Sequence, residues 1–356
     1  MSKAYGQGEA FEGIQYLRAL AAIMVVGHHA TAFFGGGPGW SNFGMTGVDI
    51  FFVISGFIMV HATYGLDPNG NRAQQAADFF VRRVIRVVPL YWLALAYMNR
   101  ADIRRGDIDA GLLADFAFIP RLSEEIPGEI YPSLVPGWTL NYEMLFYLLF
   151  GAALFWGARR YLVLVLAILA MVLVGQLWEF ESAPALFWTK SVLGEFALGV
   201  GVYLFCSQRS ITPKPWVAVA LLVVGVVALA VLAVPGIGIP RLLIFGVPAA
   251  VIVWAGVHLG RLARPSRFLG LLGDASYSIY LTHLFTFAPC FRFLRRLDVS
   301  DPTAFNIVLV LAFSTAAATA VGVAVHFMIE RPLLRIMMTF WKWRRRGASR
   351  QVATAA

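Results

Sequence analysis

Apolar runs of the length needed to cross a bilayer recur along this whole chain. A helix needs roughly 20 apolar residues to span the hydrocarbon core. We find about ten such stretches, and only 14% of the 356 residues are charged, whereas a soluble domain carries about 25%. The sequence therefore predicts an all-α, polytopic transmembrane bundle of about ten helices, at 14–34, 46–63, 79–98, 138–157, 160–178, 189–206, 215–233, 240–258, 275–292 and 304–328.

The domain organisation expected from these runs is simple. Residues 1–335 are predicted to form one ten-helix membrane domain, and residues 336–356 a basic cytoplasmic tail that frays after Trp343. The first run contains Arg18 and lacks an Ala-x-Ala cleavage site, so it reads as a retained helix and not as a signal peptide. The polar stretch 99–137 is too short for a separate catalytic domain.

Lys and Arg are divided unevenly between alternate loops, and this division orients the bundle. With the N-terminus inside, the cytoplasmic segments hold 18 of these residues and the opposite segments hold 9. Cytoplasmic loops of membrane proteins carry the excess, so both termini are predicted to be cytoplasmic. The net charge of +9 follows from this asymmetry, and we expect no nucleic-acid partner.

The first run keeps an arginine at one end and a histidine pair at the other. Arg18 and His29 are 11 residues apart, which on a helix places them about 20° apart on one face with a rise of roughly 16 Å. Ionisable groups inside lipid are costly and usually functional, although a snorkelling arginine and an interfacial histidine give the same pattern. His28 points about 80° away from Arg18, so His29 is the better candidate for a catalytic base.

The second run opens with GVDIFFVISGF, which places Asp49 at the outer end of its helix. Two consecutive antiparallel helices are expected to bring Asp49 and His29 to similar depth. A carboxylate beside an imidazole fixes the tautomer and makes the histidine a competent base. We therefore predict that Asp49 orients His29, with a helix N-cap as the alternative role. Ser55 is expected to be a packing or backbone-bonded serine.

The third run opens with the basic segment FVRRVIRVVPLYW. Arg83 and Arg86 are three residues apart and Arg82 and Arg86 four apart, so guanidinium groups share a helix face, and their forks match phosphate geometry. Arg82 is expected to be a positive-inside anchor. Arg86 lies too deep for that role, so Arg83 and Arg86 are predicted to bind a ligand, with Pro89 able to kink the helix.

Two later runs supply further candidates. Glu143 lies about two turns into an apolar helix that starts at Trp138, and a lone intramembrane carboxylate is a functional candidate, with pairing to an arginine as the alternative. Tyr280 and His283 are three residues apart and share a helix face; His283 either contacts substrate or bonds another helix. Weaker candidates, expected to be buried or to pack near the membrane interface, are Glu195, His61, His258 and His326.

Together these candidates form an asymmetric path across the membrane. The arginines lie toward the cytoplasmic side, whereas the histidine and the two acids lie toward the outside. Such a path suits a long ligand with an anionic head and a reactive far end. Acyl-CoA fits this description, because it has phosphates at one end, a thioester at the other, and an arm comparable in length to the Arg18–His29 rise. We expect acyl-CoA as a co-substrate, and no metal or tightly bound cofactor.

Six motifs, taken in order, resemble the acyltransferase-3 family of bacterial integral-membrane O-acyltransferases, and most of all its exopolysaccharide acetyltransferase branch. The resemblance covers nearly the whole chain, from about Ile14 to Leu334. Thr139 stands where the family pattern has serine and keeps the hydroxyl. The motifs are Arg18 with His29, Gly47 to Phe57, Arg83 with Arg86 and Pro89, Trp138 to Glu143, Ser276 to His283, and Glu330 to Pro332.

The resemblance implies a multi-pass enzyme of the bacterial inner membrane. Such an enzyme moves an acyl group, most often acetyl, from cytoplasmic acyl-CoA to a hydroxyl of a cell-surface or lipid-linked saccharide, alongside polysaccharide biosynthesis machinery. The acyl group goes either directly, with His29 as general base, or through a covalent intermediate on its imidazole. The predicted roles are catalysis for His29, Asp49 and Glu143, donor binding for Arg18, Arg83 and Arg86, and substrate binding for Tyr280, His283 and Trp138.

Two other functions also fit these residues. A proton-coupled transporter could use His29, Asp49 and Glu143 as a relay, although the inverted repeats or broken helices typical of transporters are not evident. A non-catalytic membrane partner of a polysaccharide synthase would share the composition and topology, but it would tolerate loss of His29.

Overall fold

A computed structural model describes residues 9–34, 43–207, 213–232, 240–262, 264–296 and 304–355. Within these ranges the chain is all-helical, and extended backbone pairs only at one isolated bridge, between Leu122 and Ile130. The described residues include six stretches long and apolar enough to cross a membrane, so the chain is a multi-pass membrane protein: Glu12–Phe34, Phe43–Thr63, Gly137–Leu177, Pro215–Leu232, Leu242–Gly260 and Asn306–Arg345.

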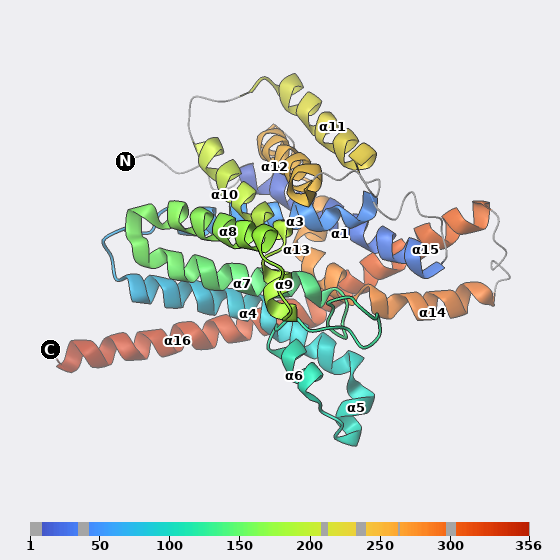
Figure 1. Ribbon diagram of the computed structural model, residues 1–356, viewed down its shortest axis with the longest axis horizontal. Coiled ribbons are helices and arrows are strands. Elements are labelled where there is room, and N and C mark those ends of the chain that lie inside the picture. Colours follow the sequence, from blue (N-terminus) through green and yellow to red (C-terminus); the bar gives the residue numbers. More distant parts are fainter. Residues whose placement is uncertain are drawn as a thin grey trace.

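Long helices form the body of the molecule, and short ones connect them or project from it (Figure 1). α5 and α6 project on one side of the bundle and α11 lies at the opposite edge. The longer helices are α1 Glu9–Phe34, α3 Gly47–Thr63, α4 Arg72–Met98, α7 Gly137–Ala153, α8 Arg160–Leu177, α10 Gly194–Ser207, α11 Pro215–Leu232, α12 Val247–Gly260, α13 Arg267–Thr282, α14 Leu284–Arg295, α15 Ala304–Val325 and α16 Arg331–Ala355. The short ones are α5 Arg100–Arg105, α6 Ala110–Phe116, η1 Leu154–Arg159, α9 Ala183–Trp188, η2 Ser191–Leu193, η3 Leu242–Gly246 and η4 His326–Glu330.

Three predicted segments differ from the helices observed. α4 starts at Arg72, two turns before its apolar run, because the Asn71 side chain accepts a hydrogen bond from Gln74 N and caps the helix. The predicted run 275–292 is divided into α13 and α14 at His283, where side chains bind the local carbonyl groups. The expected tail from residue 336 lies inside α16, and the helix continues past Trp343.

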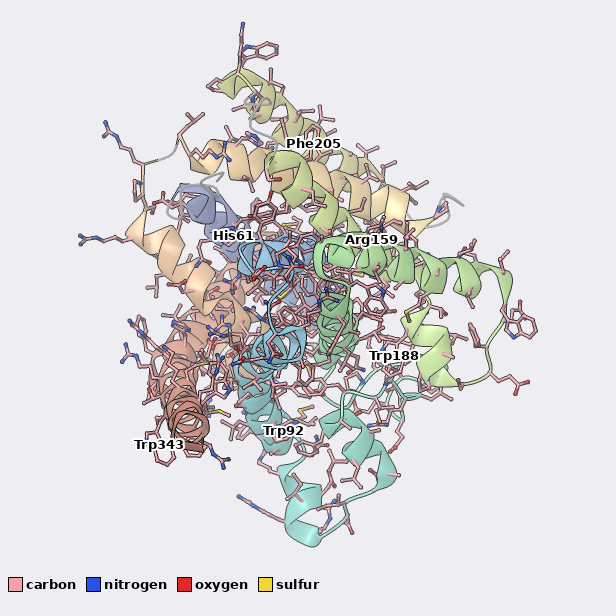
Figure 2. The ribbon with its side chains drawn as sticks, turned by 90° about the vertical axis from the view of Figure 1, so that its left-hand side faces the viewer. His61, Trp92, Arg159, Trp188, Phe205 and Trp343 are labelled. Carbon is pink, nitrogen blue, oxygen red and sulfur yellow. The ribbon has the colours of Figure 1, made fainter. Side chains whose placement is uncertain are left out.

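α16 extends along α4 and away from the rest of the bundle (Figure 1). Arg345 forms an ion pair with Asp78 at 2.5 Å, and the Arg82 guanidinium lies 5.0 Å from the centre of the Trp341 ring. Trp343 is 68% exposed and lies at the edge of the molecule (Figure 2). Contacts with α4 therefore hold the basic segment as a helix.

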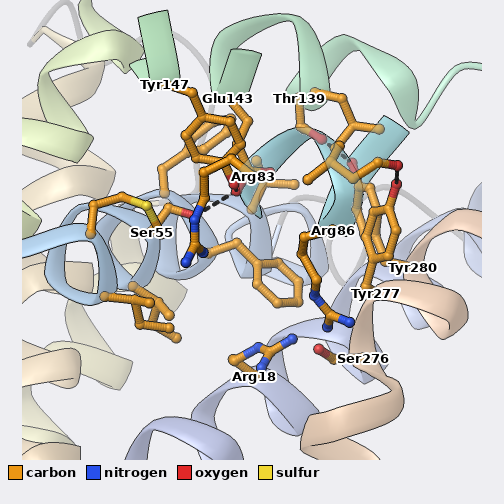
Figure 3. A pocket seen from close by; sticks show the side chains of 18 residues that line it. Arg18, Ser55, Arg83, Arg86, Thr139, Glu143, Tyr147, Ser276, Tyr277 and Tyr280 are labelled. Atoms are coloured by element: carbon orange, nitrogen blue, oxygen red, sulfur yellow. Dashed lines mark hydrogen bonds between the residues drawn. The ribbon is translucent and has the colours of Figure 1, made fainter. Parts of the chain in front are cut away.

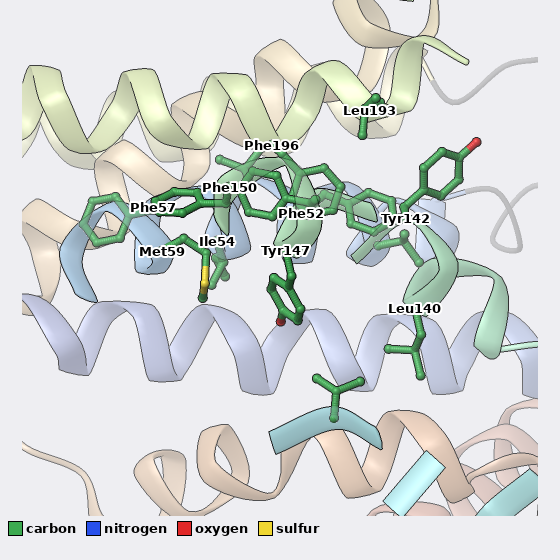
Figure 4. Close-up of a cluster of buried hydrophobic side chains, with 14 of the residues drawn as sticks. Phe52, Ile54, Phe57, Met59, Leu140, Tyr142, Tyr147, Phe150, Leu193 and Phe196 are labelled. Carbon is green, nitrogen blue, oxygen red and sulfur yellow. The ribbon is translucent and has the colours of Figure 1, made fainter. Parts of the chain in front are cut away.

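The core lies between α3, α4, α7 and α10 and is rich in aromatic side chains (Figure 4). Phe196 of α10 lies 4.8 Å from Phe52 of α3 and 4.4 Å from Phe146 of α7, measured between ring centres. Phe150 of α7 stacks on Phe79 of α4 at 4.8 Å. These aromatic pairs add to the free energy gained by burying their apolar area, and they fix α7 in its position between α4 and α10.

Glycines let α3 and α10 cross at close range. A Cβ atom at Gly199 would lie 2.1 Å from the Val53 carbonyl oxygen, and one at Gly56 would lie 2.1 Å from the Phe196 carbonyl oxygen. Small residues permit such close backbone contact between membrane helices. The crossing holds the faces of α3 that carry Asp49 and Ser55 in their positions.

We expect Gly199→Ala to destabilise the protein by about 1–3 kcal/mol, the usual cost of overpacking. Gly201→Ala is the matched control on the same helix, because nothing lies within 4 Å of its Cβ position and alanine favours helix more than glycine does. Thermal unfolding of both variants in detergent is the measurement. Equal midpoints for the two would contradict the close crossing.

The segment between α4 and α7 is folded around a buried aspartate. Asp115 is fully buried; it accepts bonds from Arg121 at 2.9 and 3.0 Å and from the backbone N and Oγ of Ser133 at 2.9 Å. The hydrogen bond to Asp115 raises the pKa of Arg121. Trp92, at the α4 end of this segment (Figure 2), donates to the Phe116 carbonyl at 2.9 Å.

Candidate functional site

A cavity of about 180 Å³ lies inside the bundle, lined by α1, α3, α4, α7 and α13. Along α3 its lining runs from Val48 to Met59 on one helix face, which corresponds to a length of about 16 Å. We call it the arginine cavity, after three of its residues. Figure 3 shows its polar side chains pointing toward one another from the surrounding helices.

Arg18, Arg83 and Arg86 line this cavity together. Arg18 comes from α1 and donates to Gln15 Oε1 at 3.0 Å. Arg83 and Arg86 lie one turn apart on α4. The Arg83 Nε is buried without a hydrogen-bond partner in the described part of the chain, so its donor capacity is unused. The structure thus brings together the three arginines that the sequence grouped, while their role as a donor site stays a prediction.

Glu330, at the end of η4, is the buried partner of Arg86. Its carboxylate is 1% exposed, forms an ion pair with Arg86, accepts from the Ser278 hydroxyl at 2.6 Å and lies 2.8 Å from His326 Nδ1. No role for Glu330 was predicted from the sequence, and His326, which was expected to pack near the membrane interface, is buried against Glu330. The Glu-Arg-Pro motif at 330–332 was the available signal, but it does not reveal a partner more than 240 positions earlier in the chain.

Glu143 of α7 points into the same cavity (Figure 3). It accepts hydrogen bonds from Ser55 Oγ at 2.9 Å and from the Tyr147 hydroxyl. The expectation that Ser55 only packs or bonds backbone was therefore wrong, because the Ser55 hydroxyl binds an intramembrane carboxylate. Within the described residues Glu143 forms no ion pair with an arginine, and its carboxylate is held by hydroxyl groups instead.

Hydroxyl groups gather in another part of the cavity. Thr139 and Tyr280 are joined by a hydrogen bond of 2.8 Å, and the Tyr280 hydroxyl also donates to the Pro136 carbonyl at 3.0 Å. The Ser276 hydroxyl is fully buried and has no bonding partner in the described chain. Trp138, one residue before Thr139, faces away from the arginine cavity and lines a second one.

His29 does not line the arginine cavity. Its ring centre lies 4.9 Å from that of His283, which in turn lies 6.2 Å from that of Tyr280 in the cavity wall. One layer of side chains thus separates His29 from the cavity. Although Arg18 and His29 share a face of α1, this layer closes the cavity before it reaches His29.

Asp49 does not orient His29, contrary to the sequence prediction. Gly44 packs on His28 and Gly47 on Ala21 and Val25, so the antiparallel α3 carries Asp49 roughly 10 Å deeper along α1 than His29. The Asp49 carboxylate is fully buried and accepts from Arg241 at 2.7 Å. No N-cap bond is formed at the start of α3 either.

Arg241 was missed as a site residue because it was counted among the loop arginines. It lies just before η3 and contacts two fully buried acids, Asp49 at 2.7 Å and Glu195 of α10 at 3.9 Å. One guanidinium therefore faces two carboxyl groups. Glu195 had been a weak candidate, and only the packing of α3 against α10 shows that it shares a cluster with Asp49.

His29 is oriented by backbone instead of by a carboxylate. Its Nδ1 lies 3.0 Å from the Val25 carbonyl oxygen. A proton on Nδ1 that is donated to this carbonyl leaves a lone pair on Nε2, which is the arrangement of a general base. His283 is held in the same way, with Nδ1 2.6 Å from the Tyr280 carbonyl oxygen and a buried Nε2 that has no partner in the described residues.

The electrostatics of the arginine cavity suit an anionic ligand. Its lining holds three arginines and one carboxylate, Glu143. Glu330, which is not part of the lining, neutralises the charge of Arg86. A net positive charge of one remains within a low-dielectric bundle, where electrostatic interactions are stronger than in water. Unused donors on Arg83 and Ser276 add hydrogen-bonding capacity.

Known proteins are similar in sequence to this chain. Residues 11–327 match the model of the acyltransferase-3 family, described as an acyltransferase domain. The exopolysaccharide production protein ExoZ of Rhizobium meliloti is 35% identical over 325 residues, which cover 87% of this chain and 92% of that protein. Protein 2 in the picA locus of Rhizobium radiobacter is 31% identical over 48% of this chain and 97% of its own length.

A shorter match connects the chain to a named O-acetyltransferase. The peptidoglycan O-acetyltransferase OatA of Listeria monocytogenes is 33% identical over 82 residues, which are 23% of this chain and 12% of that protein. No solved structure matches the chain significantly. The family match confirms the resemblance inferred from the six motifs. The chain belongs to the acyltransferase-3 family of membrane acyltransferases, and it is an enzyme that transfers acyl groups other than aminoacyl groups.

Proposed function

We propose that this enzyme moves an acyl group, most simply acetyl, from cytoplasmic acyl-CoA to a hydroxyl of a cell-surface or lipid-linked saccharide. The single observation that carries the donor assignment is the elongated cavity with three arginines and a net positive charge. The phosphates of an acyl-CoA donor match the charge of this cavity, and its pantetheine arm matches the length. The saccharide acceptor is supported by the similarity to a protein named for exopolysaccharide production.

The topology belongs to the same proposal. Residues 1–335 form the catalytic domain, which spans a bacterial inner membrane about ten times. Both termini lie in the cytoplasm. One of the six stretches already identified, Gly137–Leu177, contains two helices, α7 and α8, and the proposed count adds α4, α10 and α13. α4 is not one of the six apolar stretches, because it carries charged residues that include the arginines lining the cavity. In this orientation the arginines face the cytoplasmic supply of acyl-CoA, and polysaccharide biosynthesis machinery lies on the path of the acceptor.

In the proposed reaction the acceptor hydroxyl oxygen attacks the thioester carbon. A carbon–oxygen bond forms and the carbon–sulfur bond breaks, which gives an ester and the CoA thiolate. His29 Nε2 takes the hydroxyl proton and returns it to the thiolate, so no other reactant is needed. Tyr280 and His283 lie between His29 and the arginine cavity, and displacement of the Tyr280 side chain opens the route. Glu143, held by Ser55 and Tyr147 in the arginine cavity, lies deeper in the bundle and takes no part in this proton transfer.

We expect Arg83→Gln to raise the KM for acetyl-CoA about 10- to 100-fold, because a hydrogen bond to a charged group is worth roughly 1.5–3 kcal/mol. Arg82→Gln is the matched control: Arg82 is the preceding residue on α4, but its guanidinium lies over Trp341 and not in the cavity. The measurement is the rate of thiol release at varied acetyl-CoA by the purified enzyme. Equal KM values for the two variants would refute the donor site.

A further inference from the structure

A second cavity, of about 520 Å³, lies at the end of the bundle where α7 begins and α8 ends. We call it the aromatic pocket. Its walls come from the loop before α7, the first turn of α7, the last turn of α8, the segment from α9 to η2, and Arg241. In the proposed topology this end of the bundle faces the outside. Its volume lies in the range of about 300–1,000 Å³ typical of small-molecule sites.

Aromatic rings dominate one part of its lining. Trp138 lies at the centre of this group, with ring centres 6.4 Å from Tyr131, 6.0 Å from Tyr142 and 6.5 Å from Phe187. The Tyr142 hydroxyl is already bonded to the Phe187 carbonyl at 2.6 Å, so these two rings are fixed. The Trp138 ring is half-buried and combines an apolar face with an N–H donor, a combination common at binding surfaces.

The polar part of the lining is mixed in charge. It includes Glu129, Gln176 and Lys190, all exposed, together with Arg241. The guanidinium of Arg241 already faces the buried carboxyl groups of Asp49 and Glu195. This pocket therefore lacks the surplus of positive charge found in the arginine cavity, and a polyanion gains little there. A ligand with many hydroxyl groups finds donors, acceptors and flat apolar surfaces together.

The two cavities are separated by one layer of aromatic side chains. Phe52 lines the arginine cavity, and its ring centre lies 6.1 Å from that of Trp138 and 5.9 Å from that of Tyr142, both in the aromatic pocket. Trp138 and Thr139 are adjacent residues of α7 that face different cavities. A ligand hydroxyl in the aromatic pocket is thus one side-chain layer from a thioester held in the arginine cavity.

The loop wall of the aromatic pocket is held in place by the rest of the fold. The bonds of Asp115 to Arg121 and Ser133 flank the stretch that carries Glu129 and Tyr131. The bridge between Leu122 and Ile130 closes the same stretch. A wall anchored at both sides gives the Tyr131 ring a fixed position in the free enzyme, so little ordering is needed on binding.

We infer that the aromatic pocket is the subsite that binds the acceptor saccharide, with sugar rings against Trp138 and hydroxyl groups on the mixed polar wall. The inference rests on the proposed acyl transfer and assigns it a second, separate binding site. The acceptor approaches from the end of the bundle opposite to the arginine cavity. The aromatic layer of Phe52, Trp138 and Tyr142 controls its contact with the donor.

The test uses the full-length enzyme in lipid nanodiscs, acetyl-CoA, and the producing strain's own surface polysaccharide after mild-base removal of its O-acetyl groups. Trp138→Ala is expected to raise the KM for this polysaccharide by about 10- to 100-fold, as for loss of a central aromatic contact, with the KM for acetyl-CoA unchanged. Trp138→Phe should recover part of the affinity. Gln176→Ala, an exposed change that leaves the fold intact, should raise the same KM several-fold. Trp216→Ala, 67% exposed on α11, is the control.

Three results would overturn this assignment in different ways. If the wild-type enzyme transfers acetyl groups but Trp138→Ala and Gln176→Ala keep the wild-type KM for polysaccharide, the acceptor binds elsewhere and the proposed function stands. If a wild-type enzyme that binds acetyl-CoA transfers none of it to the polysaccharide, the saccharide acceptor itself is wrong, and the subsite falls with it. A rise in both KM values for Trp138→Ala alone would mark a packing defect and also count against the subsite.

Discussion

Replacement of His29 by alanine is expected to lower kcat for acetyl transfer by about 10²–10⁴-fold, the usual contribution of a positioned general base. The Val25 carbonyl fixes the His29 ring through Nδ1, and this ring lies beside His283, which in turn lies beside Tyr280 of the cavity wall. The KM for acetyl-CoA should stay within about twofold, because His29 does not line the arginine cavity. Release of CoA thiol in the presence of de-O-acetylated polysaccharide measures both quantities.

His61→Ala is the matched control for this prediction. His61 lies in the last turn of α3, against Tyr203 and away from His29. Its loss should therefore leave kcat unchanged. A His29→Ala enzyme with wild-type kcat would refute the assignment of His29 as the base. That result would also show that the separation of His29 from the cavity persists during turnover.

Replacement of Glu330 by alanine is expected to destabilise the protein by about 3–5 kcal/mol, the usual effect of removing one partner of a buried ion pair. Glu330 is 1% exposed and binds Arg86, Ser278 and His326. Its loss leaves the Arg86 guanidinium without a counter-charge in an apolar bundle. It also removes the links that join the end of α15 to α4 and α13. The midpoint of thermal unfolding in detergent is the measurement.

Asp102→Asn serves as the comparison for Glu330→Ala. It also removes one partner from an ion pair with an arginine, but Asp102 and Arg105 are 45% and 61% exposed, and exposed pairs contribute about 0–1 kcal/mol. A destabilisation by Glu330→Ala no larger than that of Asp102→Asn would show that Arg86 is not held by Glu330. The model of a pre-formed arginine cavity would then need revision.

The arginine group illustrates what local pattern can predict. Arg83 and Arg86 share a helix face because they are three residues apart, and both were identified from the depth of Arg86 in an apolar run. Helix periodicity fixes such relations before any tertiary contact is made. The same reasoning placed Glu143 inside a helix, and the structure shows it in the cavity with the arginines.

The partner of each charged group was not predictable in this way. Asp49 was assigned to His29 because consecutive antiparallel helices bring their ends to one side, yet the packing of Gly44 and Gly47 on α1 sets a register about two turns different. Its true partner, Arg241, is 192 positions away in the chain. Likewise Ser55 meets Glu143 across 88 positions, and Arg86 meets Glu330 across 244.

The sequence by itself determined that this chain is a membrane-embedded helical protein of the acyltransferase-3 family, because hydrophobic length and short motifs are local properties of the chain. Only the tertiary structure decided which buried charges are paired, that His29 lies behind Tyr280 and His283, and that Trp138 faces a second cavity. The physical reason is helix register: a shift of a few residues between packed helices leaves every local pattern unchanged but gives each buried polar group a different partner.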